Sequence, residues 1–393
     1  MDKVLKSIKS LIEKQKDDSG WVNLAPLGKA MVDSGISYRG LGYSKLKDVF
    51  EDYDNYFEIR CDDECEPPIM YVRLKTNRKV VSRNESSFND GDLLHWADMG
   101  DFQDALKKLK DIALAEEWGY RTSRESNLYP ILSSYIRHTF GRLTCTGKIK
   151  YADKEYAAFN TGLVDNGYES IYALFAKCDH KDKKQYWKFL AFCVAGQNKY
   201  GKLLVEKFSQ LPIRATYIDD PSVLLFDDSK GISCDWEHII LENISRLPVK
   251  FLEPYLPENF CLNDKLFKDS DYDGERYCKQ VTDIIRNDKK VFRSIKNAFE
   301  KSLDVSIKKV TWNYRVAVPT YYPKTKNVSL LFPLSLCDED YVDLALVVER
   351  SNSTKNYIGH TILPLNWAYN NARLISRLDS DWLVASLIEE ENV

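Results

Sequence analysis

The chain has 393 residues, a formal net charge of -3 at pH 7 and nine cysteines. Single hydrophobic cores stop growing at about 250 to 300 residues, so this length predicts two or three domains. The charge balance excludes a strongly basic polyanion binder, and any contact with nucleic acid must come from local patches. The cysteines form no dense framework, and no stretch has the apolar run of a signal peptide or a membrane span. We therefore expect a cytoplasmic protein that does not contact membranes.

The first 75 residues have the pattern of three short helices followed by a hairpin. The expected elements are helices over 4–12, 23–32 and 44–50 and strands over 56–60 and 69–74. Apolar residues repeat at helical spacing in the helices and alternate in the strands, and Asn23 can cap the second helix. This order is the winged variant of the helix-turn-helix, whose third helix and wing usually meet nucleic acid. We predict a winged-helix domain over 1–75 and a polar linker over 76–91.

The remaining residues, 92–393, mix helical and strand patterns. Expected helices cover 93–112, 128–140, 236–244, 278–303 and 366–375, and expected strands cover 147–151, 155–163, 169–177, 185–194, 310–322, 328–336, 342–349 and 357–363. The strands fall into two antiparallel meanders, so this domain can be divided into β-rich lobes over about 92–250 and 251–393. A duplication would explain two meanders, but coincidence explains them more simply. The predicted class is α+β, a winged helix followed by antiparallel meanders with flanking helices.

Three motifs of the N-terminal segment together resemble the LOTUS domain, also called OST-HTH. They are Trp21–Gly28, Leu41–Phe50 and Asn55–Ile59. Members of that family place an apolar-polar-Leu segment before the second helix, a Gly-aromatic pair before the third and a Phe-x-Ile strand after it. All three occur here in that order. The resemblance implies RNA binding, with a preference for structured or G-rich RNA, or binding of a protein partner instead.

Basic and aromatic side chains of this segment are the candidate RNA contacts. They are Arg39, Tyr43, Lys45, Lys47, Arg60 and Arg73. Such cations can neutralise phosphates, and a tyrosine can stack on an unpaired base. Acidic residues are about as numerous in the same segment, so charge alone favours an ordinary solvated face. The resemblance to LOTUS domains makes RNA binding the preferred interpretation.

Further segments resemble a bacterial domain of unknown function, DUF3825, that follows LOTUS modules. They are Leu94–Ala97, Ala158–Leu163, Asp343–Val347, Ala368–Ile375 and Asp379–Leu383. This resemblance implies no established activity. It names the larger domain without explaining what the domain does.

Polar residues within these segments are candidate ligand contacts for a nucleotide. They are Asn160, Thr161, Asn370, Asn371 and Arg373. Amide, hydroxyl and guanidinium groups match base edges and phosphates, and Gly162 would let a ligand approach the backbone. Structural alternatives stand beside this hypothesis, namely a bulge with a locally bonded Asn160 and pairing of Arg373 with Asp379 or Asp381. The position of Asn160 relative to Arg373 distinguishes a site from structural roles.

No metal site is predicted. Cys61 and Cys65 have a zinc-like spacing but lack a second pair nearby, which favours ordinary turn cysteines. Asp343 and Glu349 share a strand face but lie roughly 20 Å apart, too far for one metal ion. His238 is an isolated general-base candidate that is more simply structural. Glycine-rich phosphate loops and hydrolase signatures are missing, so the cofactor and the catalytic residues are left unassigned.

The sequence therefore favours an RNA-binding protein in which the winged-helix module captures RNA and the larger domain adds a second RNA- or nucleotide-binding unit. The alternatives are an RNA-processing or nucleotide-converting enzyme with its site in the larger domain, and a protein-interaction scaffold.

Overall fold

The structure of the protein is a computed structural model. It describes residues 8, 11–12, 15, 21–34, 45–47, 50, 57–62, 69–74, 92–122, 127–178, 185–260, 262–268, 272–323, 327–351 and 354–389. The chain folds into two compact units, Met1–Arg83 and Asn84–Val393. Helices and sheets occur in both units, which confirms the predicted α+β class. Among the described residues, no helix has both the length and the apolar content needed to cross a bilayer.

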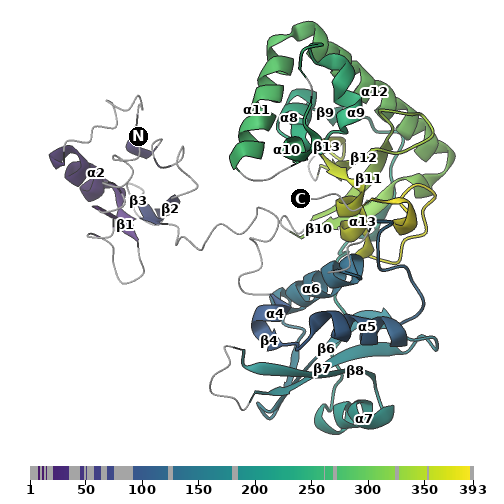
Figure 1. The fold of residues 1–393 in the computed structure, drawn as a ribbon. Helices are drawn as coiled ribbons and strands as arrows, with labels where there is room; N and C mark the ends of the chain where they lie inside the picture. Colours follow the sequence, from purple (N-terminus) through teal and green to yellow (C-terminus); the bar gives the residue numbers. More distant parts are fainter. Residues whose placement is uncertain are drawn as a thin grey trace. The chain divides into compact units, whose positions relative to one another are not determined.

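The N-terminal unit contains a helix and a three-stranded antiparallel sheet (Figure 1). Its labelled elements are β1 (Val22–Asn23), α2 (Leu24–Asp33), β2 (Phe57–Asp62) and β3 (Ile69–Leu74). Residues 8, 11, 12, 15, 46, 47 and 50 are also helical. β2 and β3 pair as the expected wing, and β1 joins the free edge of β3. A two-residue strand is too short to show alternation, so the sequence did not reveal it.

The core of the N-terminal unit confirms the apolar faces expected from the sequence. Its fully buried members include Ile8, Ile12, Leu27, Phe50 and Phe57, and Val72 of the wing packs with them. Asn23 caps α2, because its Oδ1 accepts a hydrogen bond of 2.9 Å from the Ala25 backbone N–H. A Cβ at Gly28 would lie 2.7 Å from Leu46 Cδ2, so this glycine lets α2 approach the helical residues at 46 and 47 closely.

Two five-stranded sheets organise the C-terminal unit (Figure 1). The first, in the order β4-β8-β7-β6-β5, contains β4 (Ala97–Asp98), β5 (Lys150–Ala152), β6 (Tyr156–Val164), β7 (Ser170–Lys177) and β8 (Trp187–Val194). The second, in the order β10-β11-β12-β13-β9, contains β9 (Ile232–Cys234), β10 (Val318–Tyr322), β11 (Asn327–Leu334), β12 (Leu344–Arg350) and β13 (Tyr357–Pro364). Each predicted meander is present, and each sheet gains one short parallel edge strand, β4 or β9.

Helices cover both faces of each sheet. The α-helices are α4 (Leu93–Trp96), α5 (Phe102–Ile112), α6 (Pro130–Cys145), α7 (Asn198–Lys207), α8 (Trp236–Leu241), α9 (Val249–Leu252), α10 (Asp264–Lys268), α11 (Tyr272–Asn287), α12 (Lys289–Trp312) and α13 (Leu365–Arg373). Short 3-10 turns are η1 (Pro221–Leu224), η2 (Ile244–Arg246), η3 (Glu253–Tyr255), η4 (Tyr314–Val316) and η5 (Ala385–Leu387).

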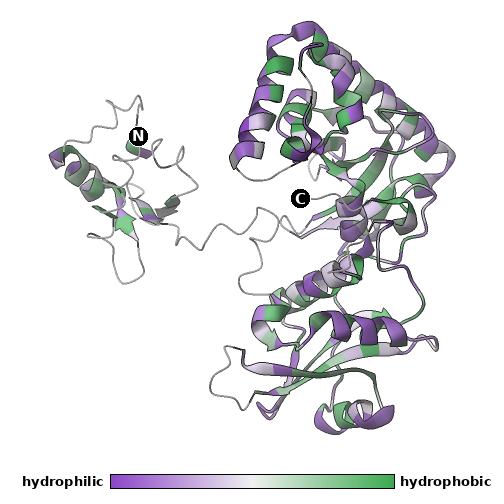
Figure 2. Ribbon diagram, viewed as in Figure 1, coloured by the Kyte–Doolittle hydropathy of each residue, from purple (hydrophilic) through white to green (hydrophobic). Residues whose placement is uncertain are grey.

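The C-terminal unit is layered around a shared helical interior. Buried side chains of α5, α6 and α13 form one core with a face of the first sheet and a face of the second. The other face of the first sheet packs on α7, and the other face of the second packs on α8 to α12 (Figure 1). Figure 2 shows apolar and polar residues alternating along α11 and α12, as in helices with one covered side. The layer of α6 and α13 therefore joins the two sheets.

Three sequence expectations are corrected at element boundaries. The helix expected over 93–112 is interrupted by β4, and Asp101 caps α5. The helix expected over 278–303 is two helices, because Asp288 accepts hydrogen bonds from the first turn of α12. The strand expected from 310 begins only at Val318, since α12 continues to Trp312.

Candidate functional site

The expected RNA-binding residues of the N-terminal unit are partly within the described residues. Lys45 directly precedes the helical residues 46 and 47, and the side chains of Lys45 and Lys47 are both exposed. The Arg73 guanidinium lies 4.5 Å from the centre of the buried Trp21 ring, a cation–π contact that fixes a planar cation on β3. Arg60 lies opposite Tyr71 in the register of the wing. Arg39, Tyr43 and the side chain of Arg60 lie outside the described residues.

In the C-terminal unit, Asn160 and Thr161 lie at a bulge where the β6–β7 register shifts. Asn160 Oδ1 accepts a hydrogen bond of 2.9 Å from the Gly162 N–H, and its Nδ2 donates to the Pro212 carbonyl at 3.4 Å. The Thr161 hydroxyl donates to the Ile171 carbonyl at 2.7 Å. Both side chains are buried. Their polar atoms are therefore satisfied within the chain, which is the arrangement of a locally bonded bulge.

Arg373 makes a buried ion pair that the sequence did not suggest. Its Nε and Nη2 donate to the two carboxylate oxygens of Glu116 at 2.5 and 2.8 Å, and the two side chains are 7% and 8% exposed. Burial opposes the charged guanidinium, but the hydrogen bonds with Glu116 raise the pKa of Arg373 above its ordinary value. The expected partner Asp379 is bonded to Arg315 instead. The pairing of Arg373 with Asp379 or Asp381 is therefore corrected to Glu116.

Gly162, at the bulge of β6, and Arg373 both lie next to Tyr135 of α6. The Arg373 guanidinium lies 4.6 Å from the Tyr135 ring centre and 5.0 Å from that of Trp118. On the other side, a Cβ at Gly162 would lie only 2.6 Å from Tyr135 Oη. Burial raises the pKa of Tyr135, and the nearby positive charge of Arg373 partly opposes that rise. Gly162 and Arg373 thus share one neighbour, while Asn160 is bonded on the side of Pro212.

The two remaining candidates lie on α13. Asn370 Oδ1 accepts a hydrogen bond of 2.8 Å from the Tyr120 hydroxyl, which also lies 2.9 Å from the Asn366 carbonyl. Asn371 is half-buried on the same helix. The Asn370 side chain therefore ties α13 to the segment that also carries Glu116.

A polar stripe along α6 was missed by the sequence reasoning. Tyr135, Thr139 and Arg142 are four and three residues apart, so they lie on one side of the helix. The Thr139 and Tyr217 hydroxyls are 3.3 Å apart, and Arg142 Nη1 donates to the Tyr321 hydroxyl at 3.3 Å. Burial raises the pKa of Tyr217. The helical spacing of these polar residues was a signal in the sequence. Their partners, Tyr217 and Tyr321, could not be inferred because they lie far away along the chain.

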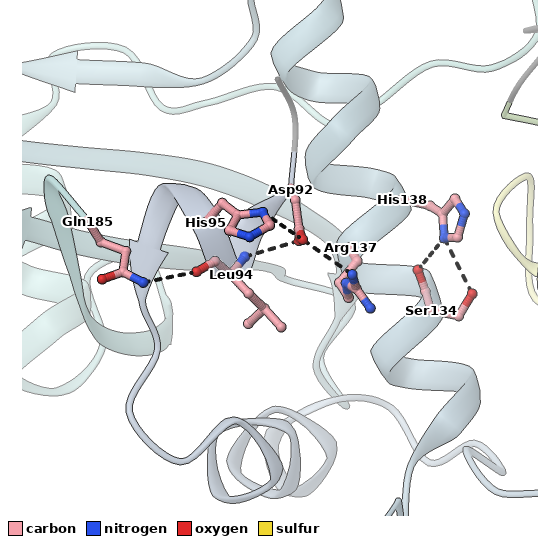
Figure 3. Close-up of polar contacts among 7 residues, drawn as sticks. All are labelled: Asp92, Leu94, His95, Ser134, Arg137, His138 and Gln185. Carbon is pink, nitrogen blue, oxygen red and sulfur yellow. Dashed lines mark hydrogen bonds and ion pairs between the residues drawn. The ribbon is translucent and has the colours of Figure 1, made fainter. Parts of the chain in front are cut away.

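A second polar cluster surrounds Asp92 at the start of α4 (Figure 3). Asp92 is 8% exposed; its Oδ1 caps α4 by accepting from the Leu94 N–H, and its Oδ2 lies 3.3 Å from both His95 Nδ1 and Arg137 Nη2. The His95 side chain is 79% exposed. An exposed imidazole that is oriented by a buried carboxylate is suited to accept a proton from solvent or substrate. His95 makes no hydrogen bond to a hydroxyl or thiol of the described residues.

His138 lies one residue beyond Arg137 on α6 (Figure 3). Its Nδ1 is 2.8 Å from the Ser134 carbonyl and 3.4 Å from the Ser134 hydroxyl. Burial lowers the pKa of His138, because it disfavours the imidazolium. On the other side of the cluster, Gln185, two residues before β8, donates from Nε2 to the Leu94 carbonyl of α4 at 3.3 Å.

The other sequence candidates have structural partners. Asp343 Oδ2 accepts from the backbone N–H groups of Leu336 and Cys337, and Glu349 lies 2.9 Å from His360 Nε2. His238 pairs with Glu242 one helical turn away, at 2.8 Å. Within the described ranges, no three His, Cys, Asp or Glu side chains gather closely enough to hold a metal ion.

Comparison with known proteins identifies both parts of the chain. The family model of the OST-HTH/LOTUS domain matches residues 1–69. The family model of a domain of unknown function, DUF3825, matches residues 109–382, more than half of the chain. No curated protein and no solved structure matches. The chain belongs to the DUF3825 family and carries an OST-HTH/LOTUS domain ahead of that domain.

Proposed function

We propose that this protein binds RNA through its N-terminal domain and that the DUF3825 domain adds a second contact with RNA or a nucleotide. The observation that carries the proposal is the OST-HTH/LOTUS match over residues 1–69, because domains of that family are generally associated with RNA binding. The preference for structured or G-rich RNA, and the alternative of a protein partner, belong to the same proposal and follow from the resemblance.

The side chains of the N-terminal unit support the proposal. Lys45 and Lys47 are exposed, so their ammonium groups can reach phosphates. Arg73, held over Trp21, presents a planar cation on the wing strand β3. A winged helix uses its third helix and its wing for nucleic acid, which is where these three cations lie. The chain as a whole is slightly acidic, so binding would depend on this local patch.

The test is a titration of fluorescently labelled RNA with the full chain, using a G-rich structured RNA and an unstructured RNA over a range of salt concentrations. Lys45→Glu with Lys47→Glu should weaken binding by about tenfold or more, because two phosphate contacts become repulsive. Lys289→Glu with Lys290→Glu, at the exposed start of α12, is the matched control for charge reversal. Unchanged affinity of the first variant would contradict the proposal, and capture of a protein in place of RNA would favour the scaffold alternative.

An RNA-processing activity is the second candidate, and the Asp92–His95 pair is the observation that favours it. The carboxylate orients the imidazole at 3.3 Å, and the exposed ring could accept a proton from water or from a ribose hydroxyl. Incubation of labelled RNA with the wild-type chain and with His95→Ala tests this reaction, with His238→Ala as the control for loss of an exposed histidine. Products formed equally by the wild type and by His95→Ala would exclude this role for His95.

A further inference from the structure

The last turns of α12 form one side of an open groove on the C-terminal unit. The groove has a volume of about 480 Å³, and the lining residues that matter here are Val305, Lys308, Lys309, Trp312, Val316 and Asp381. Val305, Lys308 and Trp312 follow one another at intervals of three and four residues, so they lie along one face of the helix. We call this surface the Trp312 groove.

Trp312 is unusual because its large ring is almost entirely in solvent. It is 92% exposed, and Tyr314, two residues further on, is 64% exposed. By contrast, Trp382 near the same groove is partly buried and donates its Nε1–H to the Val316 carbonyl at 2.9 Å. Large aromatic side chains contribute most when their surface is removed from water. The Trp312 ring makes no such contribution to the described fold, so stability does not explain its position.

Lys308 and Lys309 supply positive charge beside this ring. Other exposed cations nearby are neutralised, since Lys301 pairs with Glu339 at 3.0 Å and Arg315 with Asp379. Lys308 and Lys309 are exposed, and neither forms an ion pair with the described part of the chain. Lysines in a last turn also interact favourably with the helix C-terminus, but that effect needs no exposed tryptophan.

Exposed aromatic rings beside unpaired cations are the features with which proteins hold single-stranded nucleic acid. Bases stack on the ring, and the cations contact the backbone phosphates. Lys308 is one helical turn, about 6 Å, from Trp312 along the axis. A base stacked on Trp312 therefore leaves its phosphates within reach of the lysines. Asp381 is the carboxylate lining the groove, and it opposes bound phosphate.

We propose that the Trp312 groove is a second RNA-binding surface, which takes unpaired nucleotides by stacking on Trp312 and by phosphate contacts with Lys308 and Lys309. This inference rests on the proposed function and locates the contact made by the DUF3825 domain. The groove recognises a flexible single strand, and the N-terminal domain is the element proposed for structured RNA.

The test measures binding of a labelled single-stranded oligouridylate to the full chain as a function of salt. Trp312→Ala should weaken binding by about 5- to 30-fold without changing the salt dependence, because stacking does not release counterions. Trp312→Phe should retain part of the affinity. Lys308→Gln with Lys309→Gln should weaken binding and reduce the slope of log affinity against log salt by about 1.4, which corresponds to two lost contacts with a single strand.

Two matched variants sharpen the test. Asp381→Asn removes the opposing charge and should tighten binding. Lys289→Gln with Lys290→Gln makes the same charge change at the other end of α12, about 28 Å away, and should have little effect. All substituted side chains are exposed, so every variant should unfold thermally close to the wild type.

The outcomes separate this inference from the proposed function. If Lys45→Glu with Lys47→Glu abolishes RNA binding while Trp312→Ala and the Lys308 and Lys309 variant bind like the wild type, the groove is excluded and the proposed function stands. If the wild type binds no RNA, both fail. If Trp312→Ala changes the sedimentation of the chain and leaves RNA binding intact, the groove is a protein interface and this inference is overturned.

Discussion

Arg373 and Glu116 form a buried, two-bond ion pair across 257 residues of sequence. Arg373 lies at the end of α13, whereas Glu116 lies in the segment between α5 and α6. The pair is enclosed by the rings of Trp118 and Tyr135. It connects α13, which directly follows β13 of the second sheet, to the segment between α5 and α6.

Removal of one member of this pair should be strongly destabilising. Arg373→Met or Glu116→Leu leaves the other charge buried without its partner, which costs about 3 to 5 kcal/mol. The double variant should lose much less than the sum of the single losses, because neither charge is then left behind. Urea unfolding followed by circular dichroism measures the three free energies. Single losses that simply add would show that the two side chains act independently.

Substitution of Gly162 should also destabilise the C-terminal unit. Its φ of +77° is unfavourable for a side chain, and a Cβ would press on Tyr135 Oη. Gly162→Ala should therefore lower the free energy of unfolding by more than about 1 kcal/mol. Gly100→Ala is the matched control, since Gly100 has a φ of +65° but a Cβ there would meet nothing within 4 Å. Equal losses of unfolding free energy in the two variants would mean that contact with Tyr135 adds nothing to the destabilisation.

His138 should make stability depend on pH. Burial, with a smaller effect of the Arg137 charge, lowers the pKa of His138 in the folded state below the ordinary value of 6.5. The unfolded chain therefore takes up the proton first, so the free energy of unfolding falls as pH drops below about 6.5, by at most about 1.4 kcal/mol per pH unit until the native pKa is reached.

His138→Gln should reduce this fall, which thermal unfolding measured at about pH 7.5 and about pH 5.5 will report. His238→Gln is the control, because His238 is exposed and pairs with Glu242 at the surface. A pH dependence that is identical in the wild type and in His138→Gln would contradict the assignment to His138.

The sequence predicted most of the longer strands well, because alternation and turn residues are local signals, whereas the short strands β1, β4 and β9 were missed. β6, β7, β11 and β13 all lie close to their expected ranges. The boundary between α12 and β10 was wrong for a physical reason. Val310, Thr311 and Trp312 favour strands, but the helix before them packs its buried face on the second sheet and continues through them.

The candidate site was less predictable because its partners are distant in sequence. Asn160 could be identified as a strand-end polar residue, but its bond to the Pro212 carbonyl depends on a loop 52 residues away. Arg373 was predicted to contact a ligand or to pair with its sequence neighbours Asp379 or Asp381, whereas its partner in the structure is Glu116, 257 residues away. The Asp92–His95 pair could have been predicted from local sequence alone, because Asp92 is the N-cap of α4 and His95 follows it by three residues.

The shared interior of the C-terminal unit has a consequence for its synthesis on the ribosome. Ala368, Tyr369 and Ala372 of α13 complete the same core as Ile131 and Phe159, which are made more than two hundred residues earlier. Until α13 emerges, the side of α6 that packs on α13 stays exposed, and Glu116 lacks its cationic partner. The unit therefore reaches its final packing only when nearly all of its chain has been translated, and halves cut between the sheets would each expose half of that interior.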